Sequence, residues 1–350
     1  MIVAAPMRIS VVGPVAGGSR SVALCAVRAL RRLGHEVRFV DNARFSPGLE
    51  AIRAAPDAPA MKDAMVAELM KLAAAATREE LVATRPEVAL YLAQAPVLSE
   101  DDTAPVRAAG TLAIFWFVED RRVFPYWART ARRFDVFWGI QEGTFPAELA
   151  AVGQPRFAFV PLCCDPELHR PLPDGAGRAD PIAFVGSAWP NRLRTLAALA
   201  DLDLRLYGPG FSREPALAPR IAHDGPLPHE ELPRIFSGAR INLNLSSSTA
   251  NADWTAPKDF VNPRAFEIAG CGGFQLAEAL LPVARFFEPG VEIVTFATPD
   301  EAREAIARAL ADEAWRRAIA ERGHRRALGD HTYDRRLAEA LANVPAWRGR

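Results

Sequence analysis

The chain has 350 residues, 50% of them hydrophobic, and its 42 basic residues equal its 42 acidic residues in number. A chain of this length usually divides into two domains, because single hydrophobic cores stop growing near about 300 residues. The balanced charge excludes a global field that would attract nucleic acid or an anionic membrane, so any phosphate recognition must be local. No stretch approaches the roughly 20 apolar residues that a membrane-spanning helix requires.

The cysteines and the amino-terminal residues indicate in which cellular compartment the protein is expected. The amino-terminal "MIVAAPMRISVVGPVAGG" carries Arg8 within its apolar run, which favours a first β-strand over a signal peptide. The cysteines form no CxxC pair and have no histidines at zinc spacing. We therefore expect a cytoplasmic protein with no metal site and with reduced, structural thiols at Cys25, Cys163, Cys164 and Cys271.

The first half alternates strand and helix patterns. Residues 7–40 read as a strand, a Gly-rich turn, an apolar-periodic helix and a second strand, which is a βαβ unit with parallel strands. An Ala-rich helix is expected within 53–80, with Met61, Met65 and Met70 packing against their surroundings. Further strands are expected at 87–93, 110–118, 135–140 and 156–162.

The second half repeats this alternation after a boundary segment. Residues 161–180 are dense in Pro, Gly and Asp and show neither periodicity. The predicted fold is α/β, with Rossmann-like domains at 1–165 and 166–330 and a terminal helix at 331–350. Strands are expected at 181–186, 204–208, 241–246, 272–278 and 292–297, and helices at 191–200, 229–238 and from 299 onward.

The stretch "FVNPRAFEIAGCGGFQLAE", residues 260–278, places a carboxylate inside a segment that otherwise reads as buried. Asn262 suits the N-cap of a short helix and Pro263 its first position. Glu267 then lies in the first turns, where a carboxylate is favoured by the helix dipole but is costly to bury alone. Three explanations stay open: an ion pair with Arg264, a first-turn acid facing water, or a contact with a ligand.

Several motifs, in order, resemble those of one enzyme family. The segments "FWFVEDRRVFPYW", "VPLCCDPELHRP", "FVGSAWPNRLRTL" and "FVNPRAFEIAGCGGFQL" resemble CgeB-like (spore maturation protein type) glycosyltransferases of the retaining GT-B superfamily. The resemblance implies a GT-B fold, in which two parallel sheets face each other across a cleft and a C-terminal helix crosses back. It also implies a hexosyltransferase that uses a nucleotide-diphosphate sugar with retention and without metal.

The resemblance assigns roles to two acidic residues. In that family the second acid of an E-x7-E pattern grips the ribose hydroxyls of the donor, a role that falls on Glu267. The first acid faces the donor sugar, and Asp259 occupies its position with a shorter side chain. Asp259 is therefore a candidate catalytic residue and Glu267 a candidate donor-binding residue.

The same resemblance places a phosphate loop after the strand at 181–186. The Arg and Lys that many retaining GT-B enzymes place about five residues apart are absent, and Arg192, Arg194 or Arg264 could replace them. The alternative for Arg192 and Arg194 is that they solvate a helix. The candidate donor-binding residues are Gly186, Ser187, Arg192, Asn262, Arg264 and Glu267.

In the first domain, Glu119 and Asp120 follow the strand at 110–118, at the carboxyl end where open α/β sheets bind ligands. They are candidate catalytic residues that orient the acceptor or the donor sugar, and the alternative is a helix-capping pair. Gly17 and Gly18 allow backbone to approach a ligand, which suggests an acceptor or phosphate loop. The alternative there is an ordinary tight turn.

The sequence also limits cofactors and partners. It has no DxD-type metal site, and "EDD" at 100–102 reads as a helix cap. We expect a sugar nucleotide as co-substrate, no cofactor, no nucleic acid, and an acceptor that is a glycan, a protein or a small molecule. Two other classes stay open: a catalytically inactive nucleotide-sugar-binding protein, and an NAD-dependent oxidoreductase. The second is weakened because "GPVAGGSR" lacks the GxGxxG spacing, although Asp41 follows the second strand.

Overall fold

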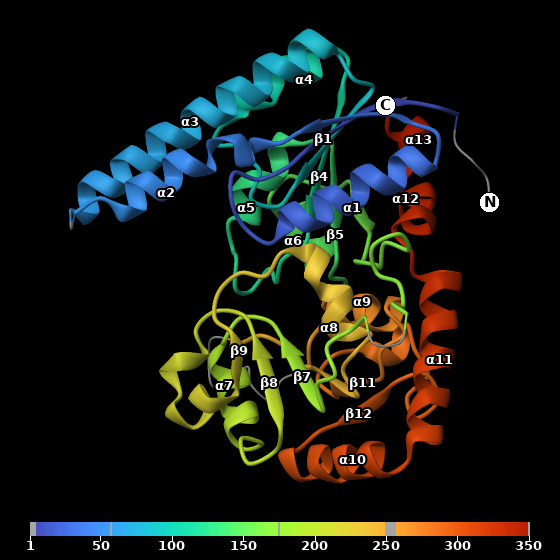
Figure 1. The fold of residues 1–350 in the computed structure, drawn as a ribbon. Helices are drawn as coiled ribbons and strands as arrows, with labels where there is room; N and C mark the ends of the chain where they lie inside the picture. The colour runs from blue at the N-terminus through green and yellow to red at the C-terminus, as the bar shows by residue number, and fades with distance from the viewer. Residues whose placement is uncertain (1–4, 57, 174–175, 249–256, 349–350) are drawn as a thin grey trace. The chain divides into compact units, whose positions relative to one another are not determined.

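A computed structural model describes the chain except for residues 1–4, 57, 174–175, 249–256 and 349–350 (Figure 1). The chain divides into two compact units. Unit 1 comprises Met1–Pro161 and Tyr333–Arg350, and unit 2 comprises Leu162–Thr332. Each unit is a six-stranded sheet flanked by helices. None of the described helices is both long and apolar enough to cross a membrane.

Unit 1 contains a parallel sheet of order β2-β1-β3-β4-β5-β6. Its central strand β4, with the sequence "LAIFWF", is buried at every position. Helices cover both faces of such a sheet, so the inner strands β3, β4 and β5 are continuously buried, whereas the edge strand β2 alternates. The strands are β1 (Arg8–Val12), β2 (Glu36–Val40), β3 (Val88–Leu92), β4 (Leu112–Phe117), β5 (Val136–Gly139) and β6 (Phe157–Phe159).

The chain returns to unit 1 at its carboxyl end. The guanidinium of Arg32 donates to both carboxylate oxygens of Asp334 at 2.7 and 2.8 Å, which ties the returning segment to α1. The segment forms two helices where one was expected, because Pro345 is tolerated only in a first turn and so begins a new helix. The helices of unit 1 are α1 (Ser19–Arg32), α2 (Ser46–Ala54), α3 (Pro59–Thr84), α4 (Ala104–Ala108), α5 (Trp127–Thr130), α6 (Phe145–Ala151), α12 (Tyr333–Leu341) and α13 (Val344–Arg348), with 3₁₀ turns η1 (Asn42–Phe45), η2 (Glu100–Asp102) and η3 (Ala131–Arg133).

Helices α2 and α3 lie side by side and extend beyond the sheet of unit 1 (Figure 1). Met61 and Met65, near the start of α3, are 52% and 43% exposed. The prediction that they pack is therefore wrong, because the first turns of α3 run past the sheet. Met70, one to two turns further on, is partly buried as predicted.

Unit 2 contains a second parallel sheet, of order β12-β11-β10-β7-β8-β9. The sequence did not predict β9, because a three-residue, largely exposed edge strand has too few residues to show a pattern. The strands are β7 (Ile182–Val185), β8 (Leu204–Tyr207), β9 (Ile221–His223), β10 (Ile241–Asn244), β11 (Gln275–Glu278) and β12 (Val294–Phe296). The helices are α7 (Pro190–Ala197), α8 (Leu232–Phe236), α9 (Arg264–Gly270), α10 (Pro299–Ala311) and α11 (Glu313–Asp330), with 3₁₀ turns η4 (Phe211–Arg213), η5 (Pro215–Arg220), η6 (His229–Glu231) and η8 (Val283–Arg285).

A glycine on α9 lets the start of unit 2 pack closely against that helix. A Cβ on Gly270 would lie 2.9 Å from Cβ of Cys164 and 3.1 Å from the carbonyl oxygen of His169. This close approach places His169 beside α9. All four cysteines are free and buried, as predicted.

Candidate functional site

Polar residues of unit 2 gather where its parallel strands end. Gly186 and Ser187 follow β7, Ser246 lies just beyond β10, and Glu278 is the last residue of β11. Helix α9, which precedes β11, carries Glu267. The carboxyl edge of such a sheet is where open α/β folds bind ligands.

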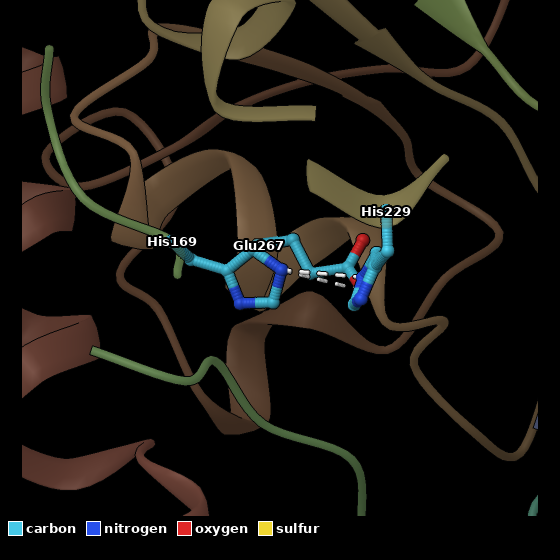
Figure 2. A group of neighbouring side chains, drawn as sticks. All are labelled: His169, His229 and Glu267. Carbon is cyan, nitrogen blue, oxygen red and sulfur yellow. Dashed lines mark hydrogen bonds and ion pairs between the residues drawn. The ribbon is translucent and has the colours of Figure 1, made fainter. Parts of the chain in front are cut away.

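Glu267 is 4% exposed and has partners on both carboxylate oxygens. Its Oε2 accepts a hydrogen bond from Nη1 of Arg264, which forms an ion pair within α9. Its Oε1 lies 3.3 Å from Nε2 of His229 and 3.9 Å from Nε2 of His169 (Figure 2). The ion pair with Arg264, one of the three explanations left open by the sequence, is thus present.

The surroundings of Glu267 keep it ionised. Burial by itself raises the pKa of this carboxyl, but the charge of Arg264 and the hydrogen bond from His229 outweigh it and hold the pKa well below its usual range. The position of Glu267 in the first turn of α9 adds the favourable helix dipole. A permanently charged acceptor therefore stands at this edge of the sheet.

His169 is fully buried, and its hydrogen bonds assign its tautomer. Its Nδ1 accepts from the backbone N–H of Asp165 at 2.9 Å, so the proton of the neutral ring is on Nε2. Burial, the largest cause, lowers the pKa of His169 to about 4, and Glu267 only partly offsets this effect. Near neutral pH the ring therefore presents an Nε2–H toward Glu267 and His229 (Figure 2).

The same three side chains have the spacing of a metal site. Their nearest ligand atoms lie within 4.8 Å of one another. A metal ion would need an unprotonated Nε2 on His169, and the Asp165 N–H at the opposite nitrogen disfavours that tautomer. The cluster of His169, His229 and Glu267 is better suited to holding a proton and donating hydrogen bonds than to binding a metal.

Arg192 joins the loops that follow β7 and β10. Its Nε donates to the carbonyl of Ser246 at 2.8 Å, its Nη2 to that of Leu245 at 3.0 Å, and its Nη1 to that of Ser187 at 3.1 Å. Burial, followed by the nearby charge of Arg264, lowers the pKa of Arg192. The side chain therefore stabilises the candidate phosphate loop. The alternative, that Arg192 only solvates the helix α7, does not account for these three hydrogen bonds.

Gly186 and Arg264 complete this part of the site. A Cβ on Gly186 would lie 2.9 Å from Nη1 of Arg192, so glycine leaves room for the guanidinium. Nε of Arg264 donates to the carbonyl of Val185 at 3.3 Å, and this links α9 to the end of β7. Two guanidinium groups thus stand at the strand ends, and that of Arg264 pairs with the ionised Glu267.

Asn262 does not cap α9, contrary to the prediction. The helix begins at Arg264, its N-cap is Pro263, and no side chain caps it. Nδ2 of Asn262 donates instead to Oδ1 of Asn244 at 2.7 Å and to the carbonyl of Leu245 at 3.2 Å. The amide is drawn to β10 because buried Asn244 and Leu245 carry acceptors there that need donors.

Glu278 is a buried acid that sequence reasoning missed. Its Oε2 accepts from the backbone N–H of Ser246 at 2.9 Å and from its Oγ at 2.5 Å. It thereby holds the same loop that Arg192 braces. Its place at the carboxyl end of a strand was a usable signal, since the same rule singled out Glu119. Asp259 is half-buried in the segment before α9, and its role stays a prediction.

Unit 1 has its own polar group at the carboxyl edge of its sheet. Glu119, just after β4, accepts hydrogen bonds from Nε2 of Gln94 at 2.7 Å and from the hydroxyl of Tyr126. Burial raises the pKa of Glu119, and these two hydrogen bonds only partly offset it. Gln94 has a φ of 67°, a left-handed conformation that a non-glycine residue rarely adopts.

Asp120 supports the turn that follows β4. Its Oδ1 accepts from the backbone N–H of Arg122 at 3.0 Å and from Nε2 of Gln141 at 3.3 Å. Its carbonyl accepts from the backbone N–H groups of Val123 and Phe124. Asp120 thus holds a turn and does not cap a helix, since the N-cap of the next helix, α5, is Tyr126, whereas Glu119 is bound to side chains.

The two glycines before α1 have different surroundings. Gly17 has a φ of 117°, and a Cβ there would lie 1.9 Å from Oε1 of Gln94. A Cβ on Gly18 would meet nothing within 4 Å. Gly17 therefore leaves room for the Gln94 side chain, while Gly18 is part of an ordinary turn. Neither Gln94 nor Tyr126 was found from the sequence.

Known proteins share this architecture. Residues 178–342 match the family model described as glycosyl transferase-like. Over 98% of this chain and all of the other, the fold is similar to sucrose-phosphate synthase from Thermosynechococcus elongatus, with a TM-score of 0.66 and 15% identity. The fold is also similar to the Anabaena protein HepE in complex with UDP-glucose, with a TM-score of 0.61 and 14% identity over 96% of this chain and all of that one. No curated protein matches the sequence.

A third structure extends the comparison. An α-glucosyltransferase in complex with UDP and DNA has a TM-score of 0.64 and 11% identity, over 97% of this chain and all of that one. At such identities the likeness establishes the fold. The chain has the GT-B fold of two Rossmann-like domains, as the sequence predicted.

Proposed function

We propose that the protein is a CgeB-like glycosyltransferase that moves a hexose from a nucleotide-diphosphate sugar to an acceptor, with retention and without metal. The match of residues 178–342 to a glycosyl transferase-like model and the GT-B fold support this class. UDP-glucose is the first donor to test, because HepE was solved with it. The four free, buried thiols suit a reducing cytoplasm.

The observation that carries the proposal is the ionised, buried Glu267 paired with Arg264, with the guanidinium of Arg192 at the same carboxyl edge of the second sheet. A carboxylate has about four lone-pair sites. Arg264 and His229 occupy part of that capacity, so the ribose hydroxyls of a nucleotide can still donate to Glu267. Charge-assisted hydrogen bonds of this kind are stronger than neutral ones.

Glycosyl transfer breaks the bond between the anomeric carbon and the leaving diphosphate oxygen and forms one to the acceptor oxygen, whose proton passes to the leaving diphosphate or to water. Negative charge develops on the diphosphate, so positive groups fixed in advance lower the barrier. Arg264 and Arg192 are the candidates, with the backbone of Gly186 and Ser187 close to the phosphates. In this proposal Asp259 faces the donor sugar.

The first-domain acids complete the proposal. Glu119 and, less directly, Asp120 organise the acceptor side. Glu119 does so through its hydrogen bonds with Gln94 and Tyr126. The expected acceptor is not a nucleic acid, because the chain carries no net charge.

The test is a donor screen on the full chain. UDP-glucose, other UDP-sugars and GDP-sugars are offered, and release of nucleoside diphosphate is followed by NMR together with the anomeric configuration of the product. We expect slow hydrolysis or transfer that retains configuration and persists in EDTA. Loss of activity in EDTA with recovery in Mn²⁺ would refute metal independence. Tight nucleotide binding without turnover would identify an inactive binder instead.

A further inference from the structure

Unit 1 has a pocket of about 620 Å³ at the carboxyl edge of its sheet, and residues of α2 and α3 form part of its wall. This volume lies within the roughly 300 to 1,000 Å³ typical of small-molecule sites. Most of its wall is apolar, with Leu49 from α2, Val66 and Met70 from α3, Val97, and Phe115 from β4. Such a wall favours a ligand with an apolar body.

Three arginines, Arg53, Arg129 and Arg133, line the same pocket, and no carboxylate is among its lining residues in the described part of the chain. Within the residues described, the side chains of Arg53 and Arg129 form no hydrogen bond or ion pair. Nη1 of Arg133 donates to the carbonyl of Val97 at 3.1 Å, which fixes its guanidinium against the wall. The pocket is therefore apolar and positively charged.

Two acids whose charges act on Arg133, Asp102 and Glu100, are also engaged by other groups. Oδ2 of Asp102 accepts from the backbone N–H groups of Leu98 and Ser99 at 2.8 and 2.9 Å. Glu100 pairs with Arg107 at 3.1 Å. These contacts leave the arginines of the pocket with positive charge that an anionic ligand would balance.

The pocket also has a fixed polar end. Gln94 and Tyr126 line it, and Glu119 accepts a hydrogen bond from each. Gly17 leaves the space in which the Gln94 side chain lies. Glu119 is thus a positioning residue, since it acts on the ligand through Gln94 and Tyr126.

We propose that this pocket binds an amphiphilic small molecule with an apolar chain or ring and one anionic group, of the phosphate monoester type. The apolar part lies against Leu49, Val66 and Met70, and the anionic group pairs with Arg129 and Arg133. The identification of this molecule as the sugar acceptor rests on the proposed function. The binding itself does not.

The experiment measures binding to the full chain by calorimetry, with no sugar nucleotide present. The probes are octyl phosphate below its critical micelle concentration, uncharged octyl glucoside, and inorganic phosphate. Octyl phosphate should bind at least about tenfold more tightly than either of the others, because it alone offers both features. Shortening the chain from octyl to hexyl and butyl should weaken binding by about fourfold per methylene removed.

Variants assign the binding to this pocket. Arg129→Gln should weaken octyl phosphate binding by about tenfold or more, as the loss of a charged hydrogen-bond donor predicts. The matched control is Arg132→Gln, which removes the same charge from an exposed residue that does not line the pocket. The control should change the affinity by less than about twofold. Arg129 is itself exposed, so its variant should keep the wild-type melting temperature.

Equal affinity for octyl phosphate and octyl glucoside would overturn the anionic requirement, and a flat chain-length series would overturn the apolar one. Equal losses in the Arg129 and Arg132 variants would remove the assignment to this pocket. The outcome also separates this inference from the proposed function. Arg129-dependent binding without any sugar transfer would leave the pocket standing and refute only the glycosyltransferase.

Discussion

The two units have the same βα architecture but opposite chemistry at the carboxyl edges of their sheets. In unit 2 the side chains at this edge are charged and form contacts with neighbouring groups of the same unit. Arg264 and His229 keep Glu267 ionised, and Arg192 donates to three backbone carbonyls. In unit 1 the edge is an apolar pocket lined by arginines, and none of the described residues that line it is acidic. Glu119, which is half-buried there, has a raised pKa, and the neighbouring Asp120 is buried.

This difference shows how one fold can serve two kinds of ligand. The strand ends provide the location in both units, but the side chains that follow them decide what binds. A nucleotide diphosphate needs fixed acceptors for ribose and fixed cations for phosphate, and we propose that Glu267, Arg264 and Arg192 of unit 2 supply them. An amphiphile needs an apolar wall and a positive patch, and we propose that the pocket of unit 1 supplies these.

The largest expected effect tests whether unit 2 depends on its buried pair. Arg264→Met leaves Glu267, whose side chain is 5% exposed, without its main partner. The loss in the free energy of unfolding should be about 3 kcal/mol, because the remaining buried charge loses Arg264 and keeps only the weaker contacts with His229 and His169 among the residues described. Denaturant unfolding measures this loss.

The matched control is Arg32→Met in unit 1. Its partner Asp334 is 22% exposed and can be solvated after the change, so the expected loss is only about 1 kcal/mol. Equal losses in the two variants would contradict the view that the pair in unit 2 is held by burial.

The second effect is a pH dependence that comes from unit 2. The pKa of folded His169 is lowered to about 4 from 6.5, so the unfolded chain binds a proton below pH 6.5 that the folded chain does not. Stability from this group is complete above pH 6.5 and is lost as pH falls toward 4. The free energy of unfolding should therefore drop by about 2 kcal/mol between pH 7 and pH 5.

His169→Asn should remove that drop, because the Asn oxygen can replace Nδ1 as acceptor for the Asp165 N–H while Nε2 is lost. Unfolding curves of both proteins at the two pH values measure it. The exposed His223→Asn serves as control and should keep the wild-type pH dependence. If the free energy of unfolding of His169→Asn still dropped as in the wild type between pH 7 and pH 5, another group would be responsible for the drop.

The third effect is smaller and tests the polar end of the pocket in unit 1. Gly17→Ala would force Gln94 away from Glu119 and strain a φ of 117°, so we expect a loss of more than about 1 kcal/mol. Gly18→Ala, the neighbouring control, meets open space and should change stability by less than about 1 kcal/mol. Thermal unfolding of the two variants measures these losses, and we expect the lower melting temperature for Gly17→Ala. Similar melting temperatures would show that Gln94 has room to move.

The sequence predicted the elements well because both sheets are made of local βα repeats. The buried strand "LAIFWF" and the amphipathic helix after β1 show their periods directly. The edge strand β9 was missed because it is short and largely exposed. Helix α9 begins one residue later than predicted, since Asn262 is satisfied by Asn244 and not by the helix.

The site was only partly predictable, and the reason is sequence separation. Glu267 and Glu119 were singled out as candidates because each lies at a recognisable place relative to a strand or helix. His169 and His229 are 60 residues apart, and Gln94 and Tyr126 are 32 apart. Such pairs meet only after the sheet has formed, so no local pattern marks them.

The central claim is that Glu267 binds the ribose of a nucleotide, and the most direct measurement is the affinity of Glu267→Gln for UDP by calorimetry. We expect a loss of about tenfold or more, since a charge-assisted hydrogen bond worth roughly 1.5 to 3 kcal/mol becomes a neutral one. Asp334→Asn, which breaks the ion pair of unit 1, should lose stability and keep the affinity. Wild-type affinity for UDP in a destabilised Glu267→Gln protein would contradict the claim and leave the carboxylate as a structural partner of Arg264.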